Sequence, residues 1–166
     1  DVEVVHYAIT AMVELFKEYD YRLQKIEKKY TNDPDDPVIL EEYCDFLKEY
    51  LSQGFMEKQM EQIYRNQYTQ LLLKQLEQKV NLHTCVCLME NLMVQRDFFL
   101  AEKILKIMDQ NWHRGEEYWI WKIRYLAERK MGKELKQSLQ ALKEEHIYLS
   151  SRGKEALGFW LDGSKK

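Results

Sequence analysis

Helix-breaking residues are scarce in this chain, which has only 6 glycines and 2 prolines among its 166 residues. Strand-rich folds with many tight turns use both residue types more heavily. The charged fraction is 32%, and leucine, lysine, glutamate and glutamine are abundant. These residues favour long amphipathic helices, so the composition predicts an all-α protein.

The chain also lacks a long apolar run and an even set of cysteines. No stretch approaches the ~20 apolar residues needed to span a bilayer, and no signal peptide is recognisable. Cys44, Cys85 and Cys87 form no even disulfide framework and indicate a reducing compartment. Because the chain begins at Asp1 without a methionine, we interpret it as a fragment. Any membrane association would then depend on a segment upstream.

A strong net charge is absent, since 25 basic and 28 acidic residues give −3. This balance provides no general attraction to nucleic acid or to anionic membranes. The two ends nevertheless differ: residues 1–62 contain 7 basic and 15 acidic side chains, whereas residues 63–166 contain 18 basic and 13 acidic ones. Such asymmetry can orient partners or subunits, although ordinary solvated helix surface is the simpler explanation.

Motifs of enzymes and metal sites are missing as well. No nucleophile elbow, P-loop or GxGxxG is present, so we predict that the chain is not an enzyme. His83, Cys85 and Cys87 place one imidazole and two thiols close together, a combination that can bind zinc. On a helix only His83 and Cys87 share a face, and no second cluster supplies further ligands. Core cysteines are the favoured interpretation, and we predict no metal and no cofactor.

What the chain does have is apolar residues at steps of three and four, which predict about eight antiparallel helices joined by short turns. Asp36 is the expected N-cap of the second helix, Pro37 its first residue and Gly54 its left-handed end. The predicted helices span residues 2–30, 38–53, 57–79, 82–95, 97–110, 116–130, 133–145 and 151–161. Such a succession predicts an all-α protein arranged as an α-solenoid or helical array.

The segment 88–108, LMENLMVQRDFFLAEKILKIM, supports the repeat interpretation. Phe98, Leu100 and Ala101, preceded by Leu88, resemble half of a tetratricopeptide (TPR) repeat, in which a small residue of the second helix lets the first helix pack closely. A step of about 34 residues, the TPR period, carries the apolar positions of this pair onto the next one. The structural repeat positions that we predict are Leu88, Leu92, Phe98, Ala101, Trp119 and Ile123. The same step from Ala101 reaches Leu135, which is not small, so the register slips near residues 131–132.

We therefore predict a single helical-repeat domain over residues 1–166. It comprises N-terminal helices over 1–81, two TPR-like helix pairs over 82–145, and a C-terminal capping helix with a tail over 146–166. The long flanking helices leave two arrangements open, packing within one monomer or across a homodimer.

The first helix of a TPR pair lines the concave surface of the array, where a protein partner binds. The predicted contact residues are Val86, Glu90, Met93, Trp121 and Arg124. For Val86 and Met93, plain packing is an equally good interpretation. Trp119 and Trp121 cannot face the same side of one helix, so one of them is expected in the core. The alternative function is nucleic-acid binding by the basic, aromatic-rich second half, although its charges are mixed and we expect no nucleic-acid partner.

Two further segments go beyond a generic repeat. One is 35–76, with its DP start, Tyr43, Leu47 and Tyr64 around a Tyr-Leu-x-x-Gly turn; the other is 126–160, LAERKMGKELKQSLQALKEEHIYLSSRGKEALGFW. Together they resemble the PelE family, the TPR-bearing inner-membrane proteins of Pel exopolysaccharide operons. The motifs consist of Leu, Tyr, Gly and Trp at helical spacing and cover about half of the chain.

This resemblance implies a non-catalytic scaffold on the cytoplasmic side of the bacterial inner membrane. Its implied partners are a PelD-type cyclic-di-GMP receptor and subunits of the polysaccharide synthase. Transmembrane helices precede the repeats in that family, so the helix over 2–30 would continue from the membrane. No family-specific binding residue can be assigned to a position of this sequence.

Overall fold

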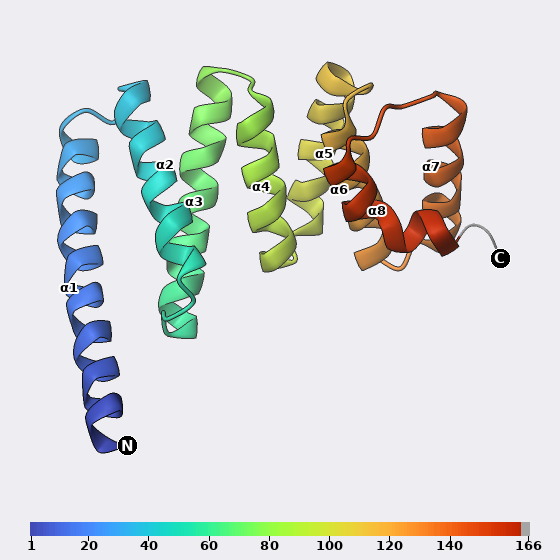
Figure 1. Cartoon of the computed structure of the whole chain (residues 1–166). Coiled ribbons are helices and arrows are strands. Elements are labelled where there is room, and N and C mark those ends of the chain that lie inside the picture. Colours follow the sequence, from blue (N-terminus) through green and yellow to red (C-terminus); the bar gives the residue numbers. More distant parts are fainter. Residues whose placement is uncertain (164–166) are drawn as a thin grey trace. The chain divides into compact units, whose positions relative to one another are not determined.

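A computed structural model describes residues 1–163 of the chain, and this part contains eight helices and no strand (Figure 1). The all-α class predicted from the sequence is thus confirmed. The tail at 164–166, predicted to follow the capping helix, lies outside the described residues. The helices are α1 (Val2–Asn32), α2 (Pro37–Ser52), α3 (Lys58–Gln78), α4 (Leu82–Gln95), α5 (Phe98–Trp112), α6 (Glu116–Glu128), α7 (Gly132–Glu144) and α8 (Ser151–Gly163).

Local side-chain chemistry fixes several helix ends. Asp36 caps α2 by accepting a hydrogen bond of 2.8 Å from the backbone N–H of Val38, and Pro37 is the first helical residue. Asn81 caps α4 in the same way, through the N–H of Thr84. Beyond the end of α2, Gly54 has a φ of 74°, a left-handed conformation that glycine adopts without a steric penalty. The predicted N-cap and left-handed end of α2 are both present.

The described chain divides into two compact units, Asp1–Lys79 and a second unit that starts at Val80. The boundary lies beside Asn81, where the sequence separates the N-terminal helices from the first TPR-like pair. The two units are described separately below.

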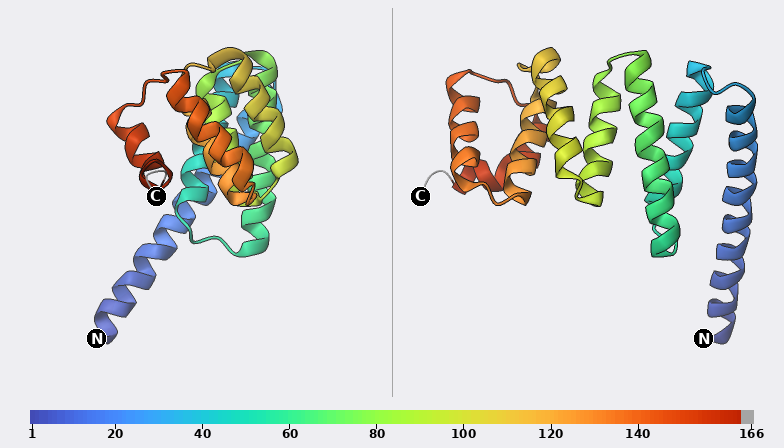
Figure 2. Two further views of the ribbon diagram at one scale, coloured as in Figure 1. Left: turned by 90° about the vertical axis from the view of Figure 1, so that its right-hand side faces the viewer. Right: turned by 180° about the vertical axis from the view of Figure 1, so that it is seen from behind.

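The first unit consists of α1, α2 and α3, and α2 packs against both of the others. Its core centres on α2, where Leu40 and Leu47 are fully buried and Tyr43 is 1% exposed. Only the C-terminal half of α1 contributes, through Tyr19 and the residues that follow it on the same face. Figure 2 shows the N-terminal half of α1 extending well past the turn between α2 and α3.

The second unit contains the helix pairs α4–α5 and α6–α7, with α8 packed against α6. Helix α6 contacts both α4 and α5. The predicted repeat positions Leu88, Leu92, Ala101 and Ile123 are fully buried here, and Trp119 is 1% exposed. The sixth, Phe98, is partly exposed and lies against the ring of Tyr125 with a centroid distance of 6.1 Å.

Every extensive contact between helices joins neighbours in the chain or helices separated by one other helix. Within residues 1–163, none of the helices has the length and apolar character that crossing a bilayer requires.

Candidate interaction surfaces

The N-terminal half of α1 presents an apolar stripe that no other helix of its unit covers. The helix has 31 residues, whereas the helix packed against it, α2, has 16. The uncovered stripe, called the α1 seam below, consists of Val2 (86% exposed), Val5 (56%), Ile9 (56%), Met12 (54%) and Phe16 (40%). Exposed apolar stripes of this length on one helix mark interaction sites.

The α1 seam continues the buried interface of α1 without a break. Steps of three and four lead from Phe16 to Tyr19, Leu23 and Ile26, which are 4%, 5% and 4% exposed. This strict alternation is the a/d spacing of a coiled coil. Phe16 meets Phe55, from the loop after α2, at a ring-centroid distance of 4.7 Å, so Phe55 lies where the covered part of the stripe ends.

The surroundings of the α1 seam carry little charge. Between Asp1 and Phe16 the acidic side chains are Asp1, Glu3 and Glu14, and the first lysine or arginine is Lys17. Sequence reasoning placed this stripe in a long helix but did not identify it as exposed. The exposure of this stripe could have been predicted from the lengths of the first two predicted helices, because the second is too short to cover the first.

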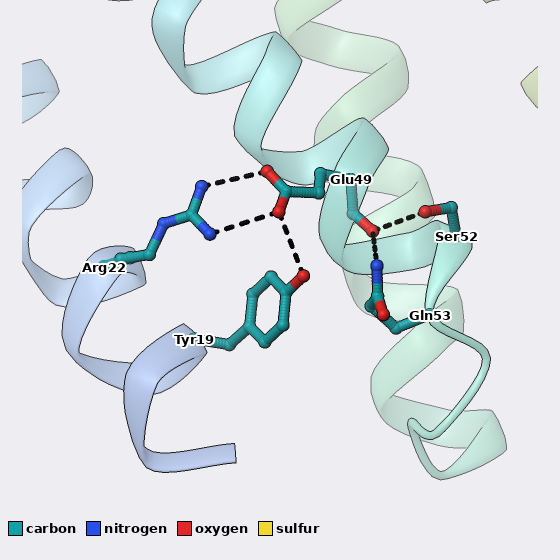
Figure 3. A network of polar contacts seen from close by, with 5 residues as sticks. All are labelled: Tyr19, Arg22, Glu49, Ser52 and Gln53. Atoms are coloured by element: carbon teal, nitrogen blue, oxygen red, sulfur yellow. Dashed lines mark hydrogen bonds and ion pairs between the residues drawn. The ribbon is translucent and has the colours of Figure 1, made fainter. Parts of the chain in front are cut away.

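A polar network closes the α1–α2 interface beside Phe46 (Figure 3). The Arg22 guanidinium donates to both carboxylate oxygens of Glu49, at 3.2 and 2.9 Å, and the Tyr19 hydroxyl donates to the same carboxylate at 3.0 Å. The bond from Arg22, followed by that from Tyr19, lowers the pKa of Glu49. Burial, and then the bond to Glu49, raises the pKa of Tyr19.

The groove beside this network has a volume of about 360 Å³ and a lining of mixed charge. One of its amines, Lys29, is already paired with Glu42 at 3.1 Å. Because the charges alternate and neutralise one another, the groove favours neither anionic nor cationic ligands. We interpret it as part of the α1–α2 packing.

In the second unit, three of the predicted contact residues share one face of α4. Val86 and Met93 are partly exposed and Glu90 is exposed. Their spacing of four and then three residues places them in one line along the helix. The structure thus brings together Val86, Glu90 and Met93 as a surface with apolar ends and an acidic centre.

The two remaining contact candidates lie on α6 and offer less surface. Trp121 is only 7% exposed, and the Arg124 guanidinium lies over its indole at 5.1 Å. The indole N–H of Trp121 is buried without a hydrogen-bond partner in the described part of the chain. Trp119, on the other side of the helix, belongs to the core and donates from Nε1 to the carbonyl oxygen of His113 at 2.7 Å. Both tryptophans are therefore largely buried.

The connector between α5 and α6 contains a histidine held by two carboxylates. His113 Nδ1 lies 2.5 Å from Asp109, and Nε2 lies 2.5 Å from Glu145 at the end of α7. Both ring nitrogens can donate only in the protonated imidazole. The bond to Asp109, and then that to Glu145, raises the pKa of His113. A groove of about 680 Å³ runs along this connector between Gln110 and Glu117.

This arrangement predicts a stability of the second unit that depends on pH. Because the folded pKa of His113 lies above its unfolded value of about 6.5, its contribution is complete below that pH and is lost as the pH rises through the folded pKa. We expect a loss below about 1 kcal/mol, because the imidazole is 41% exposed and solvent screens the pair. Denaturant midpoints across this range should decline for the wild type and stay flatter for His113→Gln. Parallel pH profiles for the two proteins would contradict the assignment.

Glu116 joins α6 to the start of α8. Its carboxylate accepts from the backbone N–H and the hydroxyl of Ser150, each at 2.8 Å, and it is paired with Arg152. The backbone hydrogen bond from Ser150 is the largest cause that lowers the pKa of Glu116. A Cβ atom at Gly153 would meet this carboxylate, so a larger residue there would require the Glu116 side chain to shift. The Ser150 hydroxyl oxygen in turn accepts from the backbone N–H of Gly153 at 3.2 Å, so Glu116 holds the residue that caps α8.

The cysteine-rich segment of α4 forms part of the core. Cys85 and Cys87 are 0% and 3% exposed, and burial raises the pKa of the Cys85 thiol to about 11. His83 Nε2 lies 3.6 Å from the sulfur of Cys87, but a substrate cannot reach a sulfur that is buried. In the described residues, no three His, Cys, Asp or Glu side chains are placed to hold a metal ion together.

Taken together, the surfaces are suited to contacts with other helices or peptides. The first unit offers the α1 seam, and the second offers the line Val86, Glu90 and Met93 on α4. No protein-family model, curated protein or solved structure matches this chain.

Proposed function

We propose that the protein is a non-catalytic scaffold for protein–protein interaction, built on TPR-like helix pairs. The observation that carries this proposal is the packing of α6, which contacts both helices of the preceding pair, α4 and α5. In TPR arrays each pair stacks on its neighbour in this way, so that the first helices line a continuous binding face. The small buried Ala101 in α5 is consistent with the close approach of α4.

The binding face in this proposal runs along α4 and α6. Val86 and Met93 supply partly exposed apolar surface on either side of Glu90. Such a line of anchors suits a partner helix or an extended peptide with apolar residues and a basic group between them. On α6, Arg124 is partly exposed, and its guanidinium packs over the indole ring of Trp121.

As the cellular setting, we propose a bacterial exopolysaccharide secretion apparatus of the Pel type. This part of the proposal rests on the resemblance of segments 35–76 and 126–160 to the PelE family. The scaffold would then work at the cytoplasmic side of the inner membrane. Its partners would be a PelD-type cyclic-di-GMP receptor and the polysaccharide synthase.

Nucleic-acid binding is the second candidate function. It is less favoured than the scaffold, because the basic side chains of α6 lie over aromatic rings of the same helix. Lys122 lies over the ring of Trp119 at 5.2 Å, Arg124 over Trp121 at 5.1 Å and Arg129 over Tyr125 at 5.7 Å. The aromatic faces that would stack on bases are thus occupied by side chains of the same unit. Affinity for RNA or DNA that falls steeply with added salt would favour this candidate over the scaffold.

The test is an affinity capture with the chain 1–166 as bait, from membrane and soluble fractions of the native organism. Met93→Asp places a charge within the proposed face and is expected to reduce capture of the partner at least tenfold. Phe99→Asp is the matched control, because Phe99 lies on α5 and is 72% exposed. Bound proteins are identified by mass spectrometry, and circular dichroism checks that both variants are folded.

Enrichment of a cyclic-di-GMP receptor or of synthase subunits, lost in Met93→Asp and kept in Phe99→Asp, would support the scaffold and its setting. Unrelated partners with the same dependence on Met93 would keep the scaffold and reject the Pel setting. Equal capture by both variants would reject the α4 face.

A further inference from the structure

We propose that the α1 seam is a dimerisation surface that pairs, antiparallel, with the α1 seam of a second copy of this chain. The stripe has the a/d spacing of a coiled coil from Val2 to Ile26, and α2 covers only its C-terminal part. A helix that occupies the free part would continue the interface that α2 has already formed. The unoccupied surface is thus shaped for one more helix.

A second helix on the α1 seam would also stabilise the uncovered part of α1. Tertiary packing supplies most helical stability in proteins, and within the first unit α2 packs only against the C-terminal part of this helix. The exposed apolar area of the α1 seam is on the order of 500 Å² per chain, judged from the exposure of its five side chains. A symmetric pair would therefore bury at most about 1,000 Å² in total, which is the size of a weak or transient interface.

The charges around the α1 seam favour a second copy over a membrane. Helices that lie in anionic membranes carry lysine and arginine on their polar face. Here the segment before Lys17 has no basic residue apart from His6, and it includes the acidic Asp1, Glu3 and Glu14. Between Glu3 and Glu14 there is no Asp, Glu, Lys or Arg to select a partner of opposite charge. An uncharged apolar stripe is complementary to itself, as a two-fold interface requires.

Packing within the first unit selects the antiparallel orientation. Helix α2 lies on the stripe of α1 at Tyr19 and beyond, and Phe55 lies against Phe16. In a parallel pair, the C-terminal half of the second α1 would have to occupy the space of α2. In an antiparallel pair, the C-terminal half of the second α1 runs past Val2 instead, so α2 of the first copy does not obstruct the overlap of the two seams. Figure 1 shows that the N-terminal half of α1 extends beyond α2 and α3.

Ile9→Asp tests the proposal directly, because Ile9 lies at the middle of the α1 seam and is 56% exposed. Tyr7→Asp is the matched control: Tyr7 is 80% exposed and lies two residues from both Val5 and Ile9, on the opposite side of the helix. Sedimentation equilibrium and light scattering, from micromolar to millimolar concentration, give the mass of the whole chain. We expect a dimer for the wild type and Tyr7→Asp, and a monomer for Ile9→Asp at the concentrations where the wild type is dimeric.

Spin labels on cysteines introduced by Thr10→Cys or Lys17→Cys report the orientation. The native thiols of Cys44, Cys85 and Cys87 are buried and react slowly. In an antiparallel pair the two labels at position 10 lie close together, and those at position 17 lie about 20 Å further apart along the axis, at 1.5 Å per residue. Equal distances at the two positions would reject the antiparallel arrangement.

A wild type that stays monomeric throughout, or a dimer that Ile9→Asp leaves intact, would overturn the proposal. So would binding of monomers to vesicles of phosphatidylcholine and phosphatidylglycerol that depends on Ile9. An antiparallel dimer places the body of the second copy beyond Val2, where a helix that continues from the membrane would lie, so finding this dimer would count against the Pel setting. The scaffold function itself is tested separately, at Met93 in the second unit.

Discussion

Replacing Ala101 by arginine is expected to destabilise the second unit strongly. Ala101 is fully buried where α5 packs against α4, so the long side chain has no room and its charge has no partner. Overpacking together with a buried unpaired charge costs about 3–5 kcal/mol, a large part of the 5–15 kcal/mol that typically stabilises a domain. All four tryptophans lie in this unit, at 112, 119, 121 and 160. Tryptophan fluorescence during denaturant unfolding therefore reports this unit alone.

Gln110→Arg is the control for this experiment. Gln110 is exposed on the same helix, so the variant adds the same charge without filling the contact between α4 and α5. Its unfolding midpoint should stay within the error of the wild type. An Ala101→Arg protein as stable as Gln110→Arg would reject the predicted role of Ala101 as the small contact residue of the repeat.

Trp119→Ala is expected to have an effect of similar size, for a different reason. The side chain is 1% exposed, and its indole N–H donates to the His113 carbonyl at 2.7 Å. Removing such a side chain leaves a cavity, and large-to-small changes of this kind cost about 3–5 kcal/mol. The free energy of unfolding should fall by this amount in denaturant titrations followed by the remaining tryptophans.

Two companion variants separate the causes. Trp119→Phe keeps most of the packing but removes the hydrogen-bond donor, so its stability should lie between those of the wild type and Trp119→Ala. Phe159→Ala removes an aromatic ring from the same unit that is 83% exposed, and it should cost little. Equal losses for Trp119→Ala and Phe159→Ala would show that Trp119 is not part of the core.

Helix positions were predictable from the sequence because they depend on local chemistry. Asp36 with Pro37 begins α2, and Gly54 follows its end. Each acts within a few residues of its own position, through a side-chain cap or a permitted backbone angle. The periodic spacing of apolar residues predicted the other helices, so about eight helices could be expected from the sequence alone.

Which apolar side chains are buried was harder to predict, because burial depends on the helices that pack against each face. In the sequence, Ile9 and Leu23 occupy equivalent positions of the same apolar stripe of α1. In the structure, however, Ile9 is 56% exposed and Leu23 is 5% exposed. The difference comes from α2, which ends before it reaches Ile9. Similarly, helical spacing showed that Trp119 and Trp121 face different sides, but not that other parts of the unit bury both of them.

Contacts between distant residues were beyond sequence reasoning altogether. Asp109 stands one helical turn before His113 and could have been noticed, whereas Glu145 comes from the end of another helix. The pairing of Glu116 with Ser150 likewise depends on how α8 returns to α6. The sequence contains the chemistry of both sites but not their proximity.

The order of the contacts between helices also affects how fast the chain folds. Since each helix packs extensively only against helices next to it or one further along the chain, little loop-closure entropy is lost before a native contact forms. Relative contact order is low for such topologies, and helical proteins of this kind fold in microseconds to milliseconds. Each helix can therefore dock soon after it leaves the ribosome, without waiting for the end of the chain.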